Sequence, residues 1–506
     1  MDVTTMSSWT PILPLFLLSL GLWSIGHLLH SLQKTPKRCH RHDLPPGPRG
    51  LPLLGNLHML GNLPHRALQN LAVVHGPIMH LRLGLTDAII ITSPSAARLV
   101  LRTHDEKLAS RAYNEAARHF SHGGRDIATA EYGPHWRAAR KLCTLHLLSR
   151  KKVDSFHSLR AEELRDLVRD LRARQRAQVP RAQVDLSEAL CALNARMMCR
   201  TVFGQRRYME CGLEEAVREF TEVILAFNVA NYVPFIGALD LQGLRRRMRT
   251  VGKRLDTFIG RIIDDHMEKD DDGLKKDFIG TMLSLVGSGE ADFPIDRTTI
   301  TALAMDMLVG GMDTSATVAE WAMSELMRHP NVMNEAREEL TRVVGVQRMV
   351  TEDDLASLPY LKKVIKECLR MHPPSPLLMH ASTEECVIGG YRVPEKARVI
   401  VNVWAIMRDP EVWVDPERFD PGRFDVDRDD DFGYLPFGSG RRGCPGREMG
   451  LTWFSLVVAQ LLHCFEWELA EGVEKEGLDM TERFGLTAPR DTPLWAVPSY
   501  RLLCEC

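Results

Sequence analysis

The chain has 506 residues and is 44% hydrophobic, a content that can bury a large core. Its 64 basic and 66 acidic residues give a net charge of -2, which argues against nucleic acid as the main partner because nucleic-acid-binding proteins normally show a strong basic excess. The 11 cysteines, scattered from Cys39 to Cys506, follow neither the spacing of a disulfide framework nor that of a zinc pair, which favours a reducing compartment.

Residues 1–33 are predicted to form a membrane anchor. The apolar run from Pro11 to Leu29 has about the length that spans a bilayer core. Four basic residues follow at once, so the positive-inside tendency predicts a cytosolic location for the rest of the chain: Lys34, Lys37, Arg38 and Arg41. The alternative, a cleaved signal peptide, would need a basic start and a small-residue cleavage site, and neither is present.

Residues 34–50 are basic and rich in proline. Pro45, Pro46 and Pro48 restrict the backbone and deny it a helix, which predicts a rigid hinge between anchor and globule. No linker divides residues 51–506, which we expect to form one catalytic domain.

The pattern after the hinge predicts a mainly α fold with small β-sheets. Residues 78–84 and 88–92 are strand-like and separated by a turn, and residues 399–405 form a further predicted strand. From about Ser95 onwards, long amphipathic stretches rich in Leu, Arg, Glu and Ala predict helices.

A long apolar helix is predicted from about Ile300 to His329, and it contains Gly310-Gly-Met-Asp313-Thr314. Two adjacent glycines weaken a helix by roughly 1 kcal/mol each relative to alanine, a cost that needs a reason. Room for a small molecule beside a cofactor is one reason. A helix kink, with the threonine bonding its own backbone, is the other, and the motif alone does not separate them.

Two pairs of residues share a helix face by their spacing. Trp136 and Arg140 stand at i and i+4, and Glu367 and Arg370 at i and i+3. Such spacings are common, and an aromatic residue beside a basic one is more often a core edge and a solvated charge. Neither pair assigns a function by itself.

The stretch from Phe437 to Gly446 presents one cysteine, Cys444, in a glycine-rich loop that lets the backbone come close to a flat cofactor. It is interpreted as a haem-thiolate site, because a thiolate on haem iron favours O–O cleavage. Arg442 could pair with a haem propionate, since a guanidinium binds a carboxylate in a two-pronged way. We include Phe437 and Gly438 among the cofactor-binding residues.

The same loop formally matches a dinucleotide fingerprint at Gly438, Gly440 and Gly443. A dinucleotide loop should follow an apolar strand and open directly into a helix. Residues 431–436 are not such a strand, and Pro445 follows closely. The context therefore disfavours the nucleotide interpretation.

With Phe437, Gly440, Arg442, Cys444 and Gly446, the loop resembles the signature of the cytochrome P-450 superfamily. The resemblance implies the P-450 fold, with haem b held between the long oxygen-side helix and the cysteine loop. It makes Cys444 the axial ligand of the haem iron.

Other positions acquire roles through the same resemblance. Gly310 to Thr314 is similar to the family's oxygen-activation motif, which implies that Thr314 and Asp313 serve proton delivery. Trp136 and Arg140 are implied to lie against a haem propionate. Glu367 and Arg370 are implied to join Arg423 in a buried structural network, where Gly422 replaces the family's usual Glu.

Four stretches most resemble the plant A-type group, at residues 44–48, 322–326, 402–405 and 437–442. The resemblance implies a monooxygenase of the endoplasmic reticulum membrane that inserts one oxygen atom into a largely apolar specialised metabolite. Electrons would come from NADPH through a flavoprotein reductase. Terpenoid and flavonoid or phenylpropanoid substrates both stay open. Pocket positions are expected at Val309, Gly310, Leu377, Leu378 and Leu486.

Two other functions remain as alternatives. A haem-thiolate isomerase or dehydratase would need no reductase, but such enzymes usually alter the oxygen-side motif, which is intact here at Asp313 and Thr314. A catalytically silent membrane scaffold would consume no NADPH. For the reductase we expect a basic face on the thiolate side: Arg137, Lys141, Arg150, Lys151, Lys152 and Arg441.

Overall fold

The computed structural model describes residues 43–503 apart from 177–182, 206–213, 234–236, 238, 269–275, 291, 427, 429–430 and 471–476. The chain divides into two compact units, Met1–Leu44 and Pro45–Cys506. The predicted membrane anchor lies outside the described residues. Among the helices that the structure describes, none combines the length and the apolar character needed to cross a membrane.

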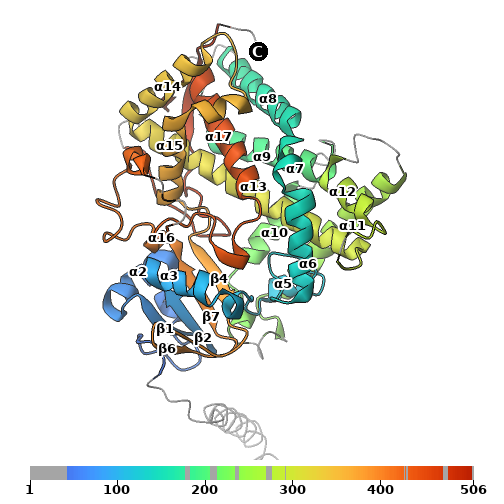
Figure 1. Cartoon of the computed structure of the whole chain (residues 1–506), viewed down its shortest axis with the longest axis vertical. Coiled ribbons are helices and arrows are strands. Elements are labelled where there is room, and N and C mark those ends of the chain that lie inside the picture. The colour runs from blue at the N-terminus through green and yellow to red at the C-terminus, as the bar shows by residue number, and fades with distance from the viewer. Residues whose placement is uncertain are drawn as a thin grey trace, which may run out of the picture. The chain divides into compact units, whose positions relative to one another are not determined.

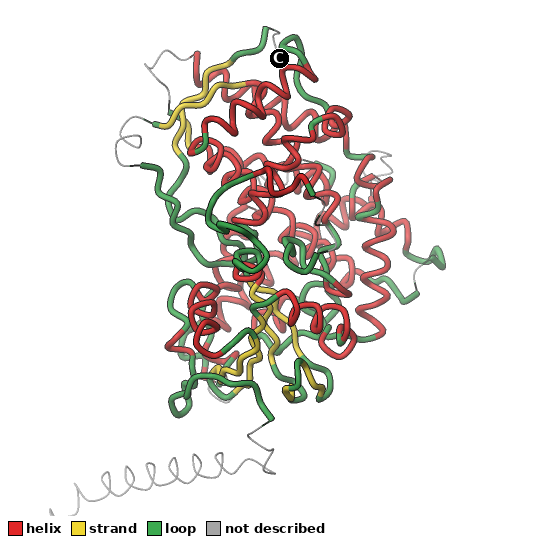
Figure 2. Tube along the Cα trace, turned by 60° about the vertical axis from the view of Figure 1, so that its left-hand side comes forward, coloured by secondary structure: helices red, strands yellow, loops and turns green. Residues whose placement is uncertain are grey.

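The second unit is mainly helical, which confirms the predicted fold class (Figure 2). The helices are α2 (Pro64–His75), α3 (Pro94–Arg98), α4 (Asp105–Leu108), α5 (Glu115–Phe120), α6 (Pro134–Leu142), α7 (Arg150–Asp154), α8 (His157–Arg176), α9 (Leu186–Phe203), α10 (Glu214–Leu225), α11 (Leu244–Glu268), α12 (Phe278–Leu285), α13 (Arg297–Arg328), α14 (Pro330–Val344), α15 (Pro359–Met371), α16 (Val403–Ile406) and α17 (Arg447–Cys464).

The strands form small sheets. They are β1 (Ile78–Leu83), β2 (Thr86–Ile91), β3 (Val184–Asp185), β4 (Leu377–Ala381), β5 (Cys386–Ile388), β6 (Tyr391–Val393), β7 (Arg398–Asn402), β8 (Phe465–Leu469) and β9 (Trp495–Tyr500). The first sheet has the order β1-β2-β7-β4, in which β2 and β7 are parallel and pair Ile89 with Val399. This sheet lies beside α2 and α3 at one end of the unit (Figure 1).

Helix α13 organises the core. The Asp296 side chain caps its start by accepting a hydrogen bond from the amide of Thr299 (2.8 Å). The helix is 32 residues long. In its second half, most residues are buried, whichever side of the helix they lie on. Figure 1 shows α13 passing through the middle of the domain, close to α9, α15 and α17.

The strand predicted at 399–405 is correct only in its first part. Strand β7 ends at Asn402, whose side chain accepts a hydrogen bond from the amide of Ala405 (3.0 Å) and so starts α16. The β-branched residues up to Val403 favour a strand, which is why the strand is expected to continue. The Asn402 side chain instead caps the start of a helix at this point. Trp404 and Ala405 therefore belong to a helix.

Candidate functional site

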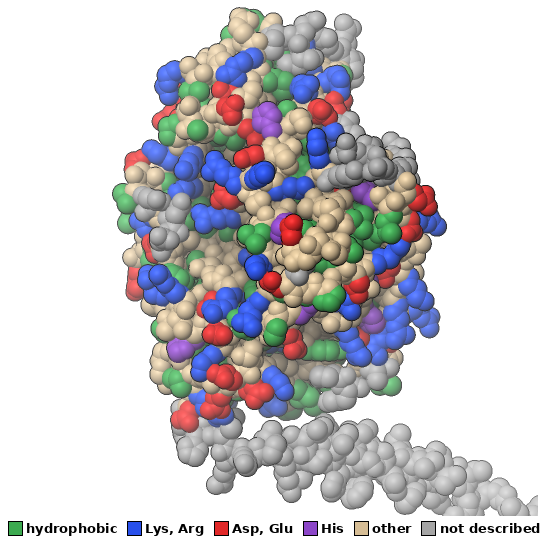
Figure 3. Space-filling model, turned by 45° about the vertical axis from the view of Figure 1, so that its right-hand side comes forward, with side chains coloured by type: hydrophobic (Ala, Val, Ile, Leu, Met, Phe, Trp, Pro, Cys, Tyr) green, Lys and Arg blue, Asp and Glu red, His purple; other side chains and the backbone are tan. Residues whose placement is uncertain are grey.

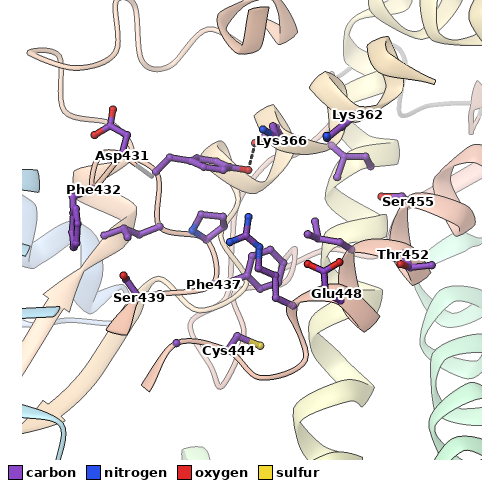
Figure 4. A pocket seen from close by; sticks show the side chains of 18 of the residues that line it. Lys362, Lys366, Asp431, Phe432, Phe437, Ser439, Cys444, Glu448, Thr452 and Ser455 are labelled. Carbon is purple, nitrogen blue, oxygen red and sulfur yellow. Dashed lines mark hydrogen bonds between the residues drawn. The ribbon is translucent and has the colours of Figure 1, made fainter. Parts of the chain in front are cut away.

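The cysteine loop lies between the loop that follows α16 and the start of α17. Gly440 adopts a φ of +71°, and a Cβ at this position would collide with the carbonyl oxygen of Leu101, so only glycine fits. The Cys444 amide donates to the carbonyl of Phe437 (2.9 Å), which closes the loop. Figure 4 shows Phe437 and Cys444 on this loop, with Lys362 and Lys366 on α15 nearby.

The Cys444 thiol faces a cavity. Burial raises the pKa of Cys444, while the Gly446 amide and the charges of Arg140 and Arg447 oppose this rise. These opposing groups favour a thiolate, the form that binds metal. The pKa of Cys444 nevertheless stays raised, so a bound iron ion would be needed to deprotonate the thiol.

Predicted propionate ligands converge beside the loop. Arg442 donates to the carbonyls of Ala109 (2.6 Å), Ile127 (3.2 Å) and Ala130 (2.6 Å), and its guanidinium lies 4.1 Å from the centre of the Trp136 ring. Trp136 donates from Nε1 to the carbonyl of Ile127 (2.9 Å). Arg140 hydrogen-bonds the carbonyl of Gly443. The structure therefore brings Trp136, Arg140 and Arg442 together.

The charges in this region suit a ligand with two carboxylates. Burial, together with the charges of Arg111 and Arg140, lowers the pKa of Arg442 to about 9. Burial also lowers the pKa of Arg111 to about 10, although Asp126 opposes it. The positive charges of buried guanidinium groups repel one another, so they need negative charge nearby to balance them. The two propionates of a haem would supply it, so these residues fit the group.

The oxygen-side motif lies on α13, where its two glycines meet different surroundings. Gly310 faces open space, whereas a Cβ on Gly311 would collide with the Met198 side chain on α9. The Thr314 hydroxyl donates to the carbonyl of Gly310 (2.8 Å), the backbone bond that the kink interpretation predicted. Burial raises the pKa of Asp313.

One cavity of about 340 Å³ joins the two halves of the site, because Cys444 and Thr314 both line it. Its lining is mostly apolar and includes two of the five predicted pocket residues, Gly310 and Leu378. The other three, Val309, Leu377 and Leu486, lie outside that lining.

Asp306 also lines this cavity, and sequence reasoning missed it. Its Oδ2 accepts hydrogen bonds from the amides of Ile127 (2.6 Å) and Ala128 (3.3 Å). Burial, then the nearby Asp126 carboxyl, raises the pKa of Asp306 well above its ordinary value. An acidic residue inside the apolar run of residues 300–312 was the available signal.

Comparison with known proteins agrees with this geometry. The family model described as Cytochrome P450 matches residues 45–495. The chain belongs to the cytochrome P450 family. This cytochrome P450 is similar to a zebra fish cytochrome P450 solved with abiraterone, with a TM-score of 0.72 at 25% identity, covering 87% of this chain and 100% of that one. The family implies a haem-iron cofactor.

Curated plant relatives match nearly the whole chain. Cytochrome P450 CYP736A12 of Panax ginseng is 46% identical, covering 92% of this chain and 95% of its own. A flavonoid 3'-monooxygenase of Arabidopsis thaliana is 40% identical, covering 94% and 95%. Desmethyl-deoxy-podophyllotoxin synthase of Sinopodophyllum hexandrum is 37% identical, covering 93% and 95%. This cytochrome P450 is therefore a monooxygenase.

The predicted structural network is assembled in this P450. Glu367 binds Arg370 through two contacts, of 2.7 Å and 2.9 Å, and both side chains are fully buried. Arg423 lies 3.3 Å from the same carboxylate, although Gly422 stands where the family usually has Glu. The Asp420 amide donates to Glu367 as well (2.9 Å).

A groove of about 1050 Å³ opens on the cysteine side of this P450. Its lining includes five basic residues: Arg102, Arg140, Lys362, Lys366 and Arg447. Of the basic face expected from the sequence, Arg137, Arg150 and Lys151 are exposed. Lys141 and Arg441 are exposed as well, but they and the half-buried Lys152 hydrogen-bond neighbouring groups of the protein. On the face drawn in Figure 3, Lys and Arg side chains are interspersed with Asp and Glu.

Proposed function

We propose that this P450 hydroxylates a largely apolar aromatic metabolite of the flavonoid or phenylpropanoid class. The observation that carries the proposal is the cavity that Cys444, Thr314 and Asp306 all line. The balanced reaction is RH + O2 + NADPH + H+ giving ROH + water + NADP+. Relatives whose names specify a flavonoid hydroxylase support the aromatic class over a terpenoid.

The substrate would enter an apolar cavity with few polar groups, the usual design of a small-molecule site. Asp306 uses Oδ2 to hold two backbone amides. Burial raises the pKa of Asp306, so its carboxyl holds a proton more readily than an exposed aspartate, and in the protonated form its other oxygen can donate a hydrogen bond to an oxygen of the substrate. This contact would favour an oxygen-bearing substrate over a plain hydrocarbon.

Haem b would be held by Cys444 at the iron and by Arg442, Arg140 and Trp136 at the propionates. When bound, it supplies the reductive activation of O2 that oxygen insertion needs. Phe437 and Gly438 belong to the loop that carries the thiol. The chain's own residues then bind and orient the substrate and deliver protons to the oxygen side.

Thr314 and Asp313 are proposed to manage protons on the oxygen side. The Thr314 hydroxyl donates a hydrogen bond to the Gly310 carbonyl, which leaves the lone pairs of Oγ1 available to accept a hydrogen bond from water in the cavity. Asp313, whose pKa is raised by burial, holds a proton more readily than an exposed aspartate. Together the two residues can pass a proton from solvent into the cavity.

The electron donor is proposed to be an NADPH-dependent flavoprotein reductase that binds over the basic groove on the Cys444 side. Lys362→Glu should slow reduction at low ionic strength and leave the substrate Kd unchanged, because exposed charge steers encounter and is screened by salt. Lys253→Glu, which changes another exposed lysine, on α11, is the control. Equal rates for both variants would refute this surface.

The location is proposed to be the endoplasmic reticulum membrane, with residues 1–33 as anchor, residues 34–50 as hinge and residues 51–506 as the catalytic domain in the cytosol. The apolar run from Pro11 to Leu29 supports this. Deleting residues 1–33 should move the protein from the membrane fraction toward the soluble fraction. An unchanged distribution would contradict the anchor.

The proposed reaction is tested by reconstituting the full chain with reductase, NADPH and 18O2 against panels of flavonoids, phenylpropanoids and terpenoids. We expect products that carry one 18O atom, formed only with NADPH, from the aromatic panels. Product without NADPH would indicate the isomerase or dehydratase alternative. Absence of product from every panel would favour the scaffold, and turnover of terpenoids alone would overturn the substrate class.

A further inference from the structure

Asn194 stands out on α9 because it is a polar side chain in the middle of a buried helix, only 1% exposed. A buried amide is costly unless its donors and acceptor find partners. Here all of its partners come from two other helices. Nδ2 donates to the carbonyl of Gly311 (2.7 Å) and to the carbonyl of Met312, both on α13.

The orientation of this amide is fixed from the opposite side. The indole N–H of Trp453 on α17 donates to Oδ1 of Asn194 (2.7 Å), and the Trp453 side chain is also buried. Because an indole can only donate, it selects the orientation in which Oδ1 faces α17 and Nδ2 faces α13. The direction of the amide is therefore set by Trp453.

Met198 lies one turn further along α9 and contacts the same place on α13. A Cβ at Gly311 would collide with its side chain, so glycine lets α9 approach α13 closely here. The contact falls directly before Asp313 and Thr314 in the chain. On the other side, α17 begins at Arg447, just after Cys444. Asn194 thus connects the helix that carries the proton-delivery pair to the helix that follows the thiolate.

We propose that Asn194 is a positioning residue, which holds the backbone of α13 at Gly311 and Met312 and thereby keeps Asp313 and Thr314 in place for proton delivery. Asn194 lies outside the lining of the cavity and so acts through α13. The proposal deepens the proposed function, because it rests on the roles given there to Asp313 and Thr314.

The test compares Asn194→Leu with wild type in the haem-loaded full chain. Leucine has the same branching and the same number of side-chain heavy atoms but no amide, so both α13 carbonyls lose their side-chain donor. We expect haem content and substrate Kd to stay within about two-fold of wild type. Hydrogen exchange at residues 315–318 should become at least about five-fold faster, the factor for each lost hydrogen bond of ~1 kcal/mol. Product formed per NADPH oxidised should fall at least about two-fold.

Thr201→Val is the matched control, because Thr201 is a buried polar residue on α9 whose hydroxyl bonds its own helix at Met197 (2.8 Å). It should change neither the exchange at 315–318 nor the product ratio. Trp453→Phe removes the indole donor together with part of a ring that lines the cavity, so the substrate Kd is measured alongside; both readouts should shift in the same direction as with Asn194→Leu, by less. If Asn194→Leu fails to retain haem, Trp453→Phe decides the question.

An unchanged product ratio and unchanged exchange in Asn194→Leu would overturn the positioning role, as would equal changes in Thr201→Val. The proposed function fails separately. If Thr314→Ala leaves the product ratio unchanged in the same assay, the proton-delivery role itself is wrong. If Thr314→Ala lowers the ratio and Asn194→Leu does not, only the inference about Asn194 is overturned.

Discussion

Removing the Glu367 carboxylate should destabilise the fold far more than removing an exposed carboxylate. Glu367 and Arg370 are both fully buried and joined by two hydrogen bonds. The carboxylate also accepts from the Asp420 amide and lies 3.3 Å from Arg423. Glu367→Ala therefore leaves a buried guanidinium without its counter-charge and an amide without its acceptor.

The expected cost can be worked from these contacts. Breaking a buried ion pair by removing one partner costs about 3–5 kcal/mol, because the other charge stays buried. Arg370 keeps its bond to the carbonyl of Met407 (2.9 Å), which offsets a part of this loss. We therefore expect the free energy of unfolding to fall by about 4 kcal/mol. Glu367→Gln keeps an acceptor oxygen and should cost less, about 2 kcal/mol.

The measurement is urea unfolding of the haem-loaded protein, followed by far-UV circular dichroism. A loss of 4 kcal/mol corresponds to a midpoint lower by roughly 1 M, since the slope increases with the surface exposed on unfolding. Asp166→Ala is the control, because Asp166, whose side chain is 21% exposed, pairs at the same helical spacing on α8 with Arg169, which is 64% exposed. It should cost less than about 1 kcal/mol. Equal midpoints for Glu367→Ala and Asp166→Ala would refute the reasoning.

Three further predictions concern single side chains. Cys444→Ser should abolish the carbon-monoxide band typical of haem-thiolate proteins, and persistence of that band would show that another residue ligates the iron. Thr314→Ala should change the free energy of substrate binding by no more than the effect of one hydroxyl, about 0.5–1.5 kcal/mol. It should nevertheless lower the product formed per NADPH oxidised. An unchanged ratio would make Thr314 a packing residue. Burial opposes ionisation of Glu482, but hydrogen bonds and charges from His65 and Arg66 outweigh it and lower its pKa from 4.5 to about 2. The resulting stability, about 3 kcal/mol, is fully present above about pH 4.5 and is lost as the pH falls toward 2. The urea midpoints of wild type and Glu482→Gln should therefore differ at pH 7 and converge at pH 2. A difference between the midpoints that persists at pH 2 would contradict this.

Features that depend on local chemistry were predictable from the sequence. The expected helix from Ile300 to His329 is α13, which begins slightly earlier, at Arg297. The Asp296 side chain caps the Thr299 amide, and that cap lay within reach of sequence reasoning. The cysteine loop was equally readable, because its glycines and its single thiol are local in sequence.

Features that depend on tertiary contact were not predictable in this way. The amides that bind Asp306 belong to Ala128 and Ile127, which lie 178 and 179 positions earlier in the chain. No periodicity of the sequence indicates such a contact. Asn194 likewise finds its partners on α13 and α17, more than 100 positions away. For both residues the sequence offered one sign, a polar side chain inside an apolar helical stretch. Such a residue must find partners when buried, but its own position does not say where they are.

The segment from Asp126 to Ala130 explains how the two faces of the site depend on each other. Its amides at Ile127 and Ala128 bind Asp306 on α13, while its carbonyls at Ile127 and Ala130 bind Arg442 in the cysteine loop. A peptide held through both its donors and its acceptors cannot move toward one partner without leaving the other. A change at Asp306 therefore reaches the Arg442 guanidinium through backbone alone. Loss of haem from an Asp306 variant would follow from this link, and would not by itself place Asp306 in contact with the cofactor.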